Sequence, residues 1–397
     1  MKTLDDVQLE GKRVFLRVDY NVPLDKQRHV TDDLRIRATL PSIRKIIDAG
    51  GKVILASHLG RPKGKVAEEY SLRPLAEYLS KLLEKPVLMA SDCIGEAARK
   101  QVSELRTGEV LLLENLRFHP GEEQDDDDFS RQLGELADVY VNDAFAVSHR
   151  AHASVHGIIR YVKICAAGYQ MEKEVNFFHK AMEDPKRPLA MVIGGAKIST
   201  KIDLLENLIP RVDCMIIGGA MANTFLKAQG KSVGKSLVED DHLQTAAHLL
   251  EKAGQRGVKV FLPVDAVVSP SREDAVDVQQ VSVDAVPPDT QILDVGPKSI
   301  EVFEAALKDC ATIVWNGPLG AFEYPPFQKG TFALAEFLGN LKALTVIGGG
   351  DSAAAVKQAG VAGKVSYVST GGGAFLELLE GKTLPGIAAL EECSQRN

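Results

Sequence analysis

Short apolar runs alternate with helix-like stretches along the whole chain. In the first half the apolar runs fall at residues 13–18, 53–57, 87–89, 110–113 and 139–141. In the second half they fall at residues 189–193, 214–217, 259–262, 312–315, 345–347 and 365–368. Stretches with helical periodicity lie between them, for example at residues 33–48, 72–83, 200–209 and 331–338. Apolar strands that alternate with helices are typical of parallel sheets covered on both faces. The pattern predicts doubly wound, Rossmann-like α/β sheets.

The length of the chain predicts two such domains in series. A single core seldom serves as many as 397 residues. We place the first domain at residues 1–170 and the second at residues 171–385. Residues 171–183 have the pattern of one helix, which Asp184-Pro185 ends because the residue before a proline disfavours helix. This stretch is the expected hinge helix between the domains.

Composition and charge exclude several classes of partner. The chain carries a net charge of -7, which argues against nucleic acid as a main partner. No apolar run approaches the roughly 18 residues that a membrane span needs. The first residues include Asp5 and Asp6, where a secretory signal would be apolar. These features predict a cytoplasmic protein with neither a membrane nor a nucleic-acid partner.

The cysteines give no sign of a disulfide or zinc framework. The 5 cysteines are scattered, and no two of them form a C-x-x-C pair. We expect them to be small buried apolar residues in a reducing cytoplasm.

Arginine and glycine are distributed in opposite directions. Of the arginines, 14 lie before residue 170 and only 5 follow it. The glycine clusters, by contrast, lie in the second half, at residues 194–195, 218–219, 348–350 and 371–373. Arginine grips carboxylate and phosphate oxygens with two parallel hydrogen bonds, and glycine turns let backbone N–H groups approach an anion. The two halves are therefore expected to bind different ligands.

Several polar side chains of the first half follow predicted strands directly. Asp19 and Asn21 close the first strand and share a face of an extended chain. The segment His58-Leu59-Gly60-Arg61 follows the second strand, and Arg117 and Arg150 follow later ones. Arg35 opens a predicted helix. Because ligands bind beyond the carboxyl ends of parallel strands, these side chains predict an anion pocket. Taken singly, each arginine is more often a surface ion pair, and Asp19 with Asn21 also suits an Asx turn.

The second half contains a strand, a glycine turn and a helix start at residues 344–358. The turn Gly348-Gly349-Gly350 suits close approach to phosphate, and a helix starting at Ser352 would point its free amides at the anion. Asp351 would repel a bare phosphate, but it suits a site where Mg²⁺ lies between the two. This segment predicts a metal-nucleotide site.

Lys197 and Lys201 follow the glycines Gly194 and Gly195. The two lysines are four residues apart, so on a helix they would share a face and repel unless an anion lies between them. An exposed basic face is an equally good interpretation of this pair. Further candidates are Gly218, Gly219, Asn316, Pro318 and Glu323, whereas Trp315 is expected in the core.

Two standard nucleotide motifs do not account for the pattern. Residues 60–65 have the glycine–lysine spacing of a Walker A loop but continue with Val66 instead of Ser or Thr. Residues 348–353 formally match the dinucleotide pattern G-x-G-x-x-A. We interpret this match as false, because Asp351 would oppose a metal-free pyrophosphate.

Taken in order, the motifs closely resemble the phosphoglycerate kinase family. They include RVDYNVP, HLGRP, ENLRFHPGEE, NDAFAVSHRAHAS, GGAKISTKI, IGGAMANTF, WNGPLGAFE, VIGGGDSAAAV and STGGGA, from Arg17 to about Gly386. The resemblance implies a first domain that binds 3-phosphoglycerate or 1,3-bisphosphoglycerate and a second that binds Mg-ADP or Mg-ATP. It also implies a monomer whose hinge closes the two domains. The last residues, about 386–397, would pack back on the first domain.

The resemblance also implies roles for individual residues. The acid substrate would be held by Asp19, Asn21, Arg35, His58, Leu59, Gly60, Arg61, Arg117 and Arg150. The nucleotide would be held by Gly194, Gly195, Lys201, Gly218, Gly219, Asn316, Pro318, Glu323, Gly349, Gly350, Asp351 and Ser352. Within this set, Glu323 would hold the ribose and Asp351 would ligate Mg²⁺. Arg35, Lys197 and Lys201 would stabilise the transferred phosphoryl group.

The expected reaction is reversible phosphoryl transfer between 1,3-bisphosphoglycerate and ADP, in line and without a general base. Two other classes share parts of the pattern. A two-domain dehydrogenase would use residues 348–353, and a two-domain solute-binding protein would also close on an anion. Binding of Mg-ADP, NAD and 3-phosphoglycerate separates the three.

Overall fold

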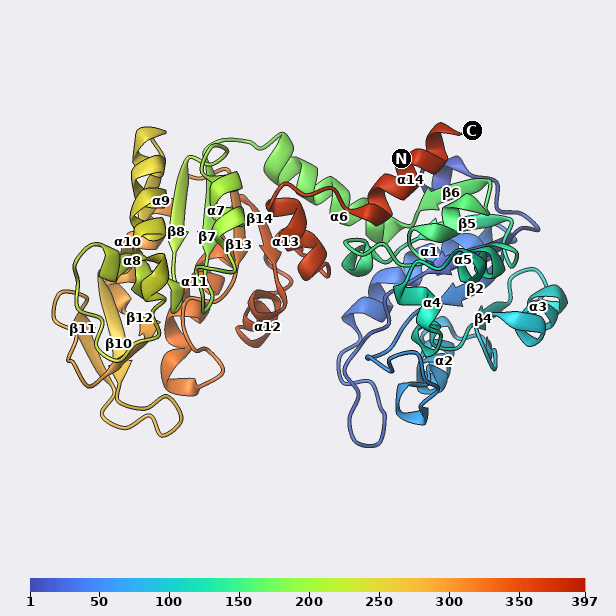
Figure 1. Cartoon of the computed structure of the whole chain (residues 1–397), viewed down its shortest axis with the longest axis horizontal. Helices are drawn as coiled ribbons and strands as arrows, with labels where there is room; N and C mark the ends of the chain where they lie inside the picture. The colour runs from blue at the N-terminus through green and yellow to red at the C-terminus, as the bar shows by residue number, and fades with distance from the viewer. Residues whose placement is uncertain (397) are drawn as a thin grey trace. The chain divides into compact units, whose positions relative to one another are not determined.

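Residues 1–396 are described by a computed structural model, in which the chain divides into two units (Figure 1). The first unit comprises Met1–Val175 and Thr383–Asn397, and the second comprises Asn176–Lys382. Of the expected tail at residues 386–397, residue 397 lies outside the described part. Each unit is built on a six-stranded parallel sheet, which confirms the predicted α/β class with doubly wound parallel sheets.

The sheet of the first unit has the strand order β3-β4-β2-β1-β5-β6. Its strands are β1 (Arg13–Arg17), β2 (Lys52–Ala56), β3 (Val87–Met89), β4 (Val110–Leu112), β5 (Val139–Asn142) and β6 (Ile164–Ala167). Every ladder in this sheet is parallel. The apolar runs predicted β1 to β5. They did not predict β6, a four-residue edge strand made largely of small residues.

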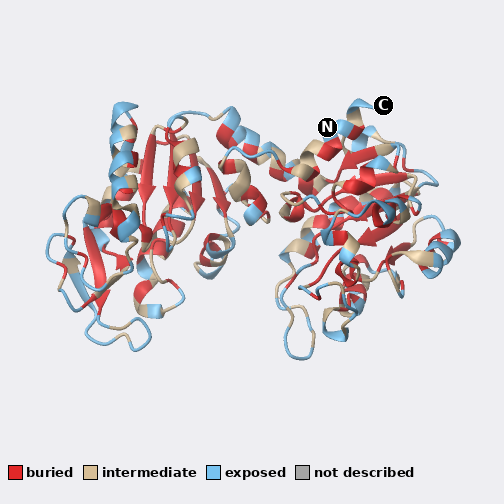
Figure 2. Ribbon diagram, in the orientation of Figure 1, coloured by how far each residue is buried: buried red, intermediate tan, exposed pale blue. Residues whose placement is uncertain are grey.

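Helices cover both faces of this sheet. They are α1 (Leu34–Asp48), α2 (Arg73–Leu83), α3 (Gly95–Glu104), α4 (Pro120–Glu123), α5 (Asp127–Gly134) and α14 (Pro385–Gln395). Helix α6 (Tyr169–Phe178) begins in this unit and continues past Val175 into the second unit. On one face, α1 and α2 bury apolar residues such as Ile43 and Leu79 against Val14 and Leu55. Residues that point to the other face, such as Tyr140, are also buried, so the strands are apolar throughout (Figure 2).

The second unit has a parallel sheet in the order β15-β14-β13-β7-β8-β9. Its strands are β7 (Leu189–Ile193), β8 (Cys214–Ile217), β9 (Lys259–Phe261), β13 (Thr312–Asn316), β14 (Leu344–Gly348) and β15 (Tyr367–Val368). Its helices are α7 (Ile202–Leu208), α8 (Met221–Ala228), α9 (Leu243–Gln255), α10 (Pro297–Leu307), α11 (Lys329–Asn340), α12 (Gly350–Gln358) and α13 (Gly373–Leu379). The six apolar runs of the second half correspond to these six strands. Trp315 is fully buried on β13, as predicted.

A second, three-stranded antiparallel sheet in this unit was not predicted. It has the order β11-β10-β12, with β10 (Asp265–Ser269), β11 (Gln279–Ser282) and β12 (Gln291–Val295). β11 is mostly exposed, so its sequence lacks the apolar run by which the other strands were found. This small sheet carries part of the pocket described below.

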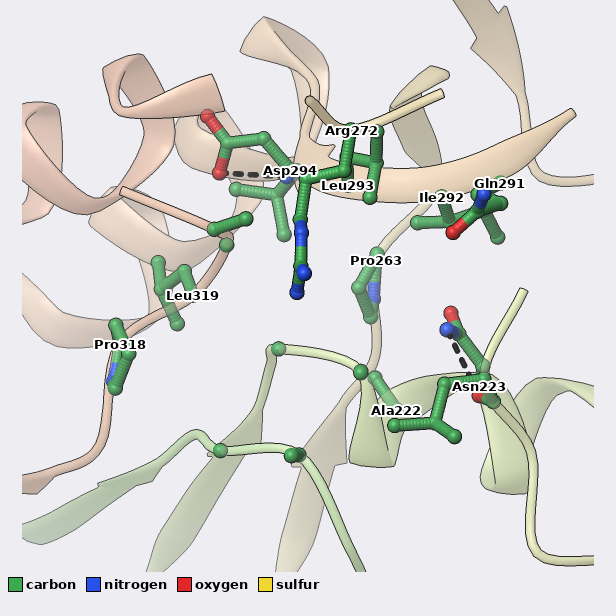
Figure 3. A pocket seen from close by; sticks show the side chains of 18 of the residues that line it. Ala222, Asn223, Pro263, Arg272, Gln291, Ile292, Leu293, Asp294, Pro318 and Leu319 are labelled. Carbon is green, nitrogen blue, oxygen red and sulfur yellow. Dashed lines mark hydrogen bonds between the residues drawn. The ribbon is translucent and has the colours of Figure 1, made fainter. Parts of the chain in front are cut away.

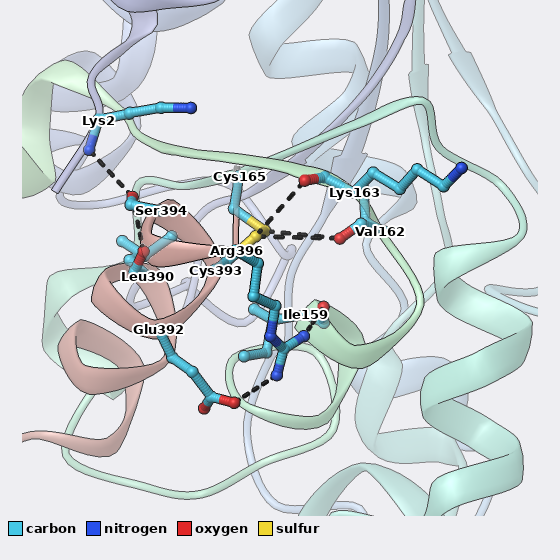
Figure 4. The surroundings of a disulfide bond; sticks show 10 residues. All are labelled: Lys2, Ile159, Val162, Lys163, Cys165, Leu390, Glu392, Cys393, Ser394 and Arg396. Carbon is cyan, nitrogen blue, oxygen red and sulfur yellow. Dashed lines mark hydrogen bonds and ion pairs between the residues drawn. A yellow bond between two sulfur atoms is a disulfide. The ribbon is translucent and has the colours of Figure 1, made fainter.

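The expectation that no cysteine forms a disulfide is wrong. Cys165 on β6 and Cys393 on α14 are joined, with their Cα atoms 6.0 Å apart (Figure 4). The two cysteines are 228 positions apart in sequence, so no local spacing motif signals the pair. The remaining cysteines, Cys93, Cys214 and Cys310, are free and buried as expected.

The predicted helix at residues 171–183 begins earlier and changes type. It starts at Tyr169 as α6, and a π-helical turn follows at His179–Glu183. The start is set by Asp143, whose Oδ1 accepts hydrogen bonds from the backbone N–H groups of Gln170 and Met171 at 2.8 and 3.1 Å.

Among the described helices, none combines the length and apolar character required to cross a membrane.

Candidate active site

The predicted substrate residues of the first unit lie at one edge of its sheet. Arg17 ends β1 and pairs in register with Ala56 on β2 and with Asn142 on β5. The segments that follow these strands therefore leave the sheet side by side. Asp19 and Asn21 come from the first of these segments and His58 from the second. The carboxyl edge is where parallel α/β sheets bind ligands.

Hydrogen bonds join several of these residues into one group. The Arg35 guanidinium donates to Asp19 Oδ2 at 2.7 Å and to the backbone oxygen of Asn21 at 3.1 Å. Asn21 Oδ1 accepts from the backbone N–H of Gly60 at 2.9 Å. Arg117 donates to the backbone oxygen of Gly60, also at 2.9 Å. These five residues thus form one connected site.

A buried arginine that we did not assign to the site lies beneath it. Arg17 is fully buried, and its Nε donates to Ser154 Oγ at 2.7 Å. Its Nη2 lies 3.7 Å from Glu122 Oε1 and 3.3 Å from His58 Nδ1. A fully buried arginine requires a partner of opposite charge, which Glu122 provides. The sequence could have indicated this role, because Arg17 is a charged residue at the end of an otherwise apolar strand.

The histidines at this edge are kept neutral, first by burial and then by the neighbouring arginines. The pKa of His58 is held well below its usual value by burial, then by Arg17, Arg117, His152 and Arg35. Burial and nearby arginines, among them Arg150, lower the pKa of His152 to about 3. Both imidazoles are therefore neutral at neutral pH, and the arginines carry the charge. Such a cluster attracts anions even though the net charge of the chain is negative.

Two predicted residues take a different place. Leu59 is buried, and its backbone oxygen accepts from Asn115 Nδ2 at 2.8 Å, which anchors the segment that follows β2. Arg61 is exposed, and within the described residues no hydrogen bond or ion pair joins it to this group.

In the second unit, four strands end side by side at the carboxyl edge. Asn316 on β13 pairs in register with Gly348 on β14 and with Ile193 on β7, and Ile193 pairs with Ile217 on β8. The predicted nucleotide residues that directly follow or end these strands are thereby neighbours; they are Gly194, Gly195, Gly218, Gly219, Asn316, Pro318, Gly349 and Gly350.

The glycines are required by the geometry of this edge. Gly349 has φ +91°, in the region that favours glycine. A Cβ atom on Gly194 would lie 2.0 Å from the backbone oxygen of Pro318. Helix α12 begins at Gly350, two residues before the predicted start, so Asp351 and Ser352 lie in its first turn. Ser352 Oγ accepts from the backbone N–H of Gly317 at 2.6 Å.

Lys201 is tied to this edge, whereas Lys197 is not. Lys201 Nζ donates to Asn316 Oδ1 at 2.8 Å. Burial lowers the pKa of Lys201, and the nearby Glu380 and Asp351 oppose this effect. Helix α7 begins only at Ile202, so Lys197 lies in the preceding turn and is exposed. The expected pairing of the two lysines on one helical face is therefore wrong.

A cavity of about 260 Å³ opens beside the glycine turns (Figure 3). Five of the predicted residues line it, namely Gly195, Gly219, Pro318, Glu323 and Asp351. Sequence reasoning missed the rest of the lining, which includes Asn223, Leu237, Pro263, Arg272 and residues 291–295. Several of these belong to β12 or lie in loops next to the antiparallel sheet, which the apolar pattern did not reveal. Asn223 lies within the quoted motif IGGAMANTF but was given no role.

Two α/β units, one with an arginine cluster and the other with glycine turns beside a pocket, are typical of a nucleotide-dependent phosphotransferase. The first unit has neutral histidines among arginines, and the second has glycine turns, a lysine and a pocket. The phosphoglycerate kinase family profile matches residues 4–382. The chain therefore belongs to the phosphoglycerate kinase family.

Individual relatives agree along the whole length of the chain. The phosphoglycerate kinase of Syntrophobacter fumaroxidans is 69% identical over 397 residues, covering 100% of both chains. That of Desulfosudis oleivorans is 53% identical over 391 residues, covering 98% of this chain and 99% of the relative. The solved structure of phosphoglycerate kinase from Coxiella burnetii has a TM-score of 0.90 at 42% identity, covering 98% of each chain. The one from Pyrococcus horikoshii has a TM-score of 0.87 at 32% identity, covering 100% of each chain.

Family membership identifies the reaction. The chain is a glycolytic kinase that transfers a phosphoryl group reversibly between 1,3-bisphosphoglycerate and ADP, giving 3-phosphoglycerate and ATP. This assignment replaces the dehydrogenase and solute-binding alternatives.

Proposed function

We propose that each unit binds one of the two substrates. In the first unit, 3-phosphoglycerate or 1,3-bisphosphoglycerate is held by Asp19, Asn21, Arg35, His58, Leu59, Gly60, Arg61, Arg117 and Arg150. In the second, ATP or ADP is held by Gly194, Gly195, Lys201, Gly218, Gly219, Asn316, Pro318, Glu323, Gly349, Gly350, Asp351 and Ser352. The proposed acid-binding domain comprises residues 1–170 together with the tail at about 386–397. The proposed nucleotide-binding domain comprises residues 171–385. The positive potential of the arginine cluster and the cavity beside the glycine turns support this division.

The chemistry needs positioning and charge more than proton transfer. The carboxylate of 3-phosphoglycerate is already a nucleophile, so no general base has to activate it. The transferring phosphoryl group spreads negative charge over its equatorial oxygens, which fixed cations stabilise. We assign this role to Arg35, Lys197 and Lys201. For Lys201, the hydrogen bond to Asn316 Oδ1 at 2.8 Å supports the assignment because it fixes the ammonium at the edge of the sheet.

Mg²⁺ fits the residues of the second unit. Asp351 offers an exposed carboxylate that lines the cavity next to the glycine turn, and Mg²⁺ prefers oxygen ligands of this kind together with substrate phosphates. When bound, the ion would neutralise phosphate charge. The role of Asp351 would be to hold the metal-bound nucleotide so that its phosphates lie next to Lys201.

Because the two substrates are assigned to different units, we propose that transfer takes place when the units close about a hinge near α6. Closure would bring the reacting groups in line and exclude water, which would otherwise hydrolyse the acyl phosphate. We further propose that the enzyme acts as a cytoplasmic monomer, with small-molecule substrates as its partners and no nucleic acid or membrane.

The observation that carries the proposal is the shared edge of four strands at which Lys201, Asn316 and the glycine turns meet. A coupled assay tests it by following ATP formation from 1,3-bisphosphoglycerate and ADP, with and without added Mg²⁺. We expect ATP to form only when Mg²⁺ is present. ATP formation that is unaffected by a chelator would refute the metal assignment, and no ATP formation would refute the proposed transfer.

A further inference from the structure

Three side chains of metal-binding types come together in the loops that follow β3 and β4. Asp92 and Cys93 lie between β3 and α3, and His119 lies between the 3₁₀ turn Leu116–Phe118 and α4. One ligand atom of each side chain lies within 4.8 Å of the other two. Among residues 1–396, no other group of three or more histidine, cysteine and acidic side chains is as compact. The proposed substrate sites use none of these three residues.

The spacing of the three atoms suits a tetrahedral ion. Zinc bonds of about 2.0–2.3 Å place neighbouring ligand atoms about 3.3–3.6 Å apart. His119 Nε2 and Asp92 Oδ1 are joined by a hydrogen bond of 2.6 Å, so an ion bound between them requires this pair to open by about 0.7 Å. Because both side chains are partly exposed, they can separate without displacing the core.

The thiol forms the inner part of this group. Cys93 is fully buried, whereas the side chains of His119 and Asp92 are 29% and 43% exposed. A cation therefore reaches the outer pair from solvent and meets the sulfur next. Burial raises the pKa of the Cys93 thiol, so the sulfur carries its proton until a metal binds. That proton leaves to solvent when the sulfur coordinates the ion.

Contacts outside the group already hold two of its members in place. Asp92 Oδ1 accepts a hydrogen bond from the backbone N–H of Cys93 at 2.6 Å. The ring of His119 packs against Phe129, with the ring centres 5.5 Å apart. Outer contacts of this kind fix the orientation of metal ligands and so strengthen metal binding.

The types of ligand atom determine which cation the group suits. Thiolate and imidazole ligands favour zinc and similar transition metals, whereas Mg²⁺ prefers a shell made of oxygen. We propose that Asp92, Cys93 and His119 form a zinc site, with water in the fourth position. The ion would join the loop after β3 to the segment after β4. This site is separate from Asp351, the proposed Mg²⁺ ligand in the second unit.

Co²⁺ and Zn²⁺, each added alone to the full-length protein, test the proposal. The protein is purified without reductant, stripped with a chelator and titrated in excess Mg²⁺. We expect one Co²⁺ per chain, with the strong visible bands of a tetrahedral ion and the near-ultraviolet band of a sulfur–cobalt bond. Zn²⁺ should remove both sets of bands. It should also raise the Tm, because an ion that binds only the folded chain stabilises it.

Substitutions identify the ligands. Cys93→Ser should remove the sulfur–cobalt band and weaken Zn²⁺ binding by about 10²-fold or more, since loss of an outer contact alone costs about 10–100-fold. Cys214→Ser changes another buried free cysteine and, as the matched control, should keep the band. His119→Gln should weaken Zn²⁺ binding to a similar extent. His248→Gln, at an exposed position on α9, should bind as wild type does.

Three results would overturn the proposal. The first is a wild type without the sulfur–cobalt band, which would mean that the group is only hydrogen-bonded. The second is a band that survives Cys93→Ser. The third is an unchanged Zn²⁺ affinity in His119→Gln. If Cys93→Ser melts at a lower temperature without metal, His119→Gln decides, because its side chain is partly exposed.

Discussion

Individual side chains at the acid site derive their properties from burial. Arg17 is fully buried and is balanced by Glu122, which leaves its remaining donors to fix Ser154 and His58. The depressed pKa of His58 means that the imidazole is neutral before substrate binds. Positive charge at this edge is therefore carried by guanidinium groups, which remain charged across the physiological pH range.

Arg35 is the residue at which we expect the largest loss. Arg35→Ala should lower kcat by about 10²-fold, as for loss of one preorganised charge contact, because it removes the cation held by Asp19 and Asn21. Steady-state kinetics measure the loss, and circular dichroism should show an unchanged fold. Arg37→Ala is the matched control, since Arg37 lies on the same helix, is exposed and pairs with Asp33. Turnover close to wild type in Arg35→Ala would contradict the assignment.

A buried carboxyl in the second unit should make stability depend on pH. Burial raises the pKa of Asp294 from 3.8 to about 7, although Gly330 and Val295 donate backbone hydrogen bonds to it. Between these two values the native carboxyl holds a proton that the unfolded chain has released. The free energy of unfolding therefore falls as the pH rises through this window.

Asp294→Asn tests this effect because an amide does not titrate. From pH 5 to pH 8, wild type should lose stability relative to the variant by on the order of 1 kcal/mol. Urea denaturation at each pH measures the difference. A difference between the two proteins that stays constant across the range would show that Asp294 is ionised in the native state.

The sequence predicted the residues whose place follows from the chain direction alone. Asp19, His58 and Asn316 end or follow parallel strands, and within each sheet all such strand ends lie at one edge whatever the tertiary details. Arg17 was not assigned because its role depends on what surrounds it. Its charge is balanced by Glu122, which comes from a helix distant in the sequence.

At the scale of elements, the sequence predicted those strands that are buried on both faces of a sheet. Strands such as β7 and β13 are buried along their full length, so their apolar runs are visible without the fold. In the small antiparallel sheet, β11 is the edge strand next to β10 and is mostly exposed, so its composition is that of a loop. Helix α7 begins at Ile202, two residues after the predicted start, and residues 197–201 form the turn before it.

The terminal helix α14 is held to the first unit by more than packing. Gly386 donates its backbone N–H to Ser148 at 2.8 Å, Lys2 donates to Ser394 at 3.2 Å, and Cys393 is bonded to Cys165 (Figure 4). We therefore expect reduction with dithiothreitol to lower the Tm of wild type, since losing a native disulfide typically costs about 2–5 kcal/mol. Calorimetric melting curves with and without reductant measure the effect.

Cys393→Ser provides the control for that experiment. Its Tm should match that of reduced wild type and should not respond to the reductant. Thiol titration of the denatured, unreduced protein should find three free thiols, from Cys93, Cys214 and Cys310. Five free thiols in protein purified without reductant would show that the pair is kept reduced.

At the scale of the whole molecule, the chain enters the second unit once and returns. The first unit contains both Met1–Val175 and Thr383–Asn397, so the second unit is an insertion between them. The disulfide joins Cys165, before the insertion, to Cys393, after it, and so closes a covalent loop around the whole second unit. Each unit nevertheless has its own sheet and its own core, which makes separate ligand sites physically reasonable.

This separation predicts that damage to one site leaves binding at the other intact. Asp351→Asn removes the carboxylate proposed for Mg²⁺ and should weaken Mg-ADP binding by about 10-fold or more, as for loss of a charged contact. Binding of 3-phosphoglycerate to the same variant should be unchanged, because the arginine cluster lies in the other unit. Calorimetric titration with each ligand alone measures both affinities. Glu301→Gln, an exposed carboxylate on α10, is the matched control and should bind both ligands as wild type does. Equal losses for the two ligands in Asp351→Asn would mean that Asp351 supports the fold and not the metal.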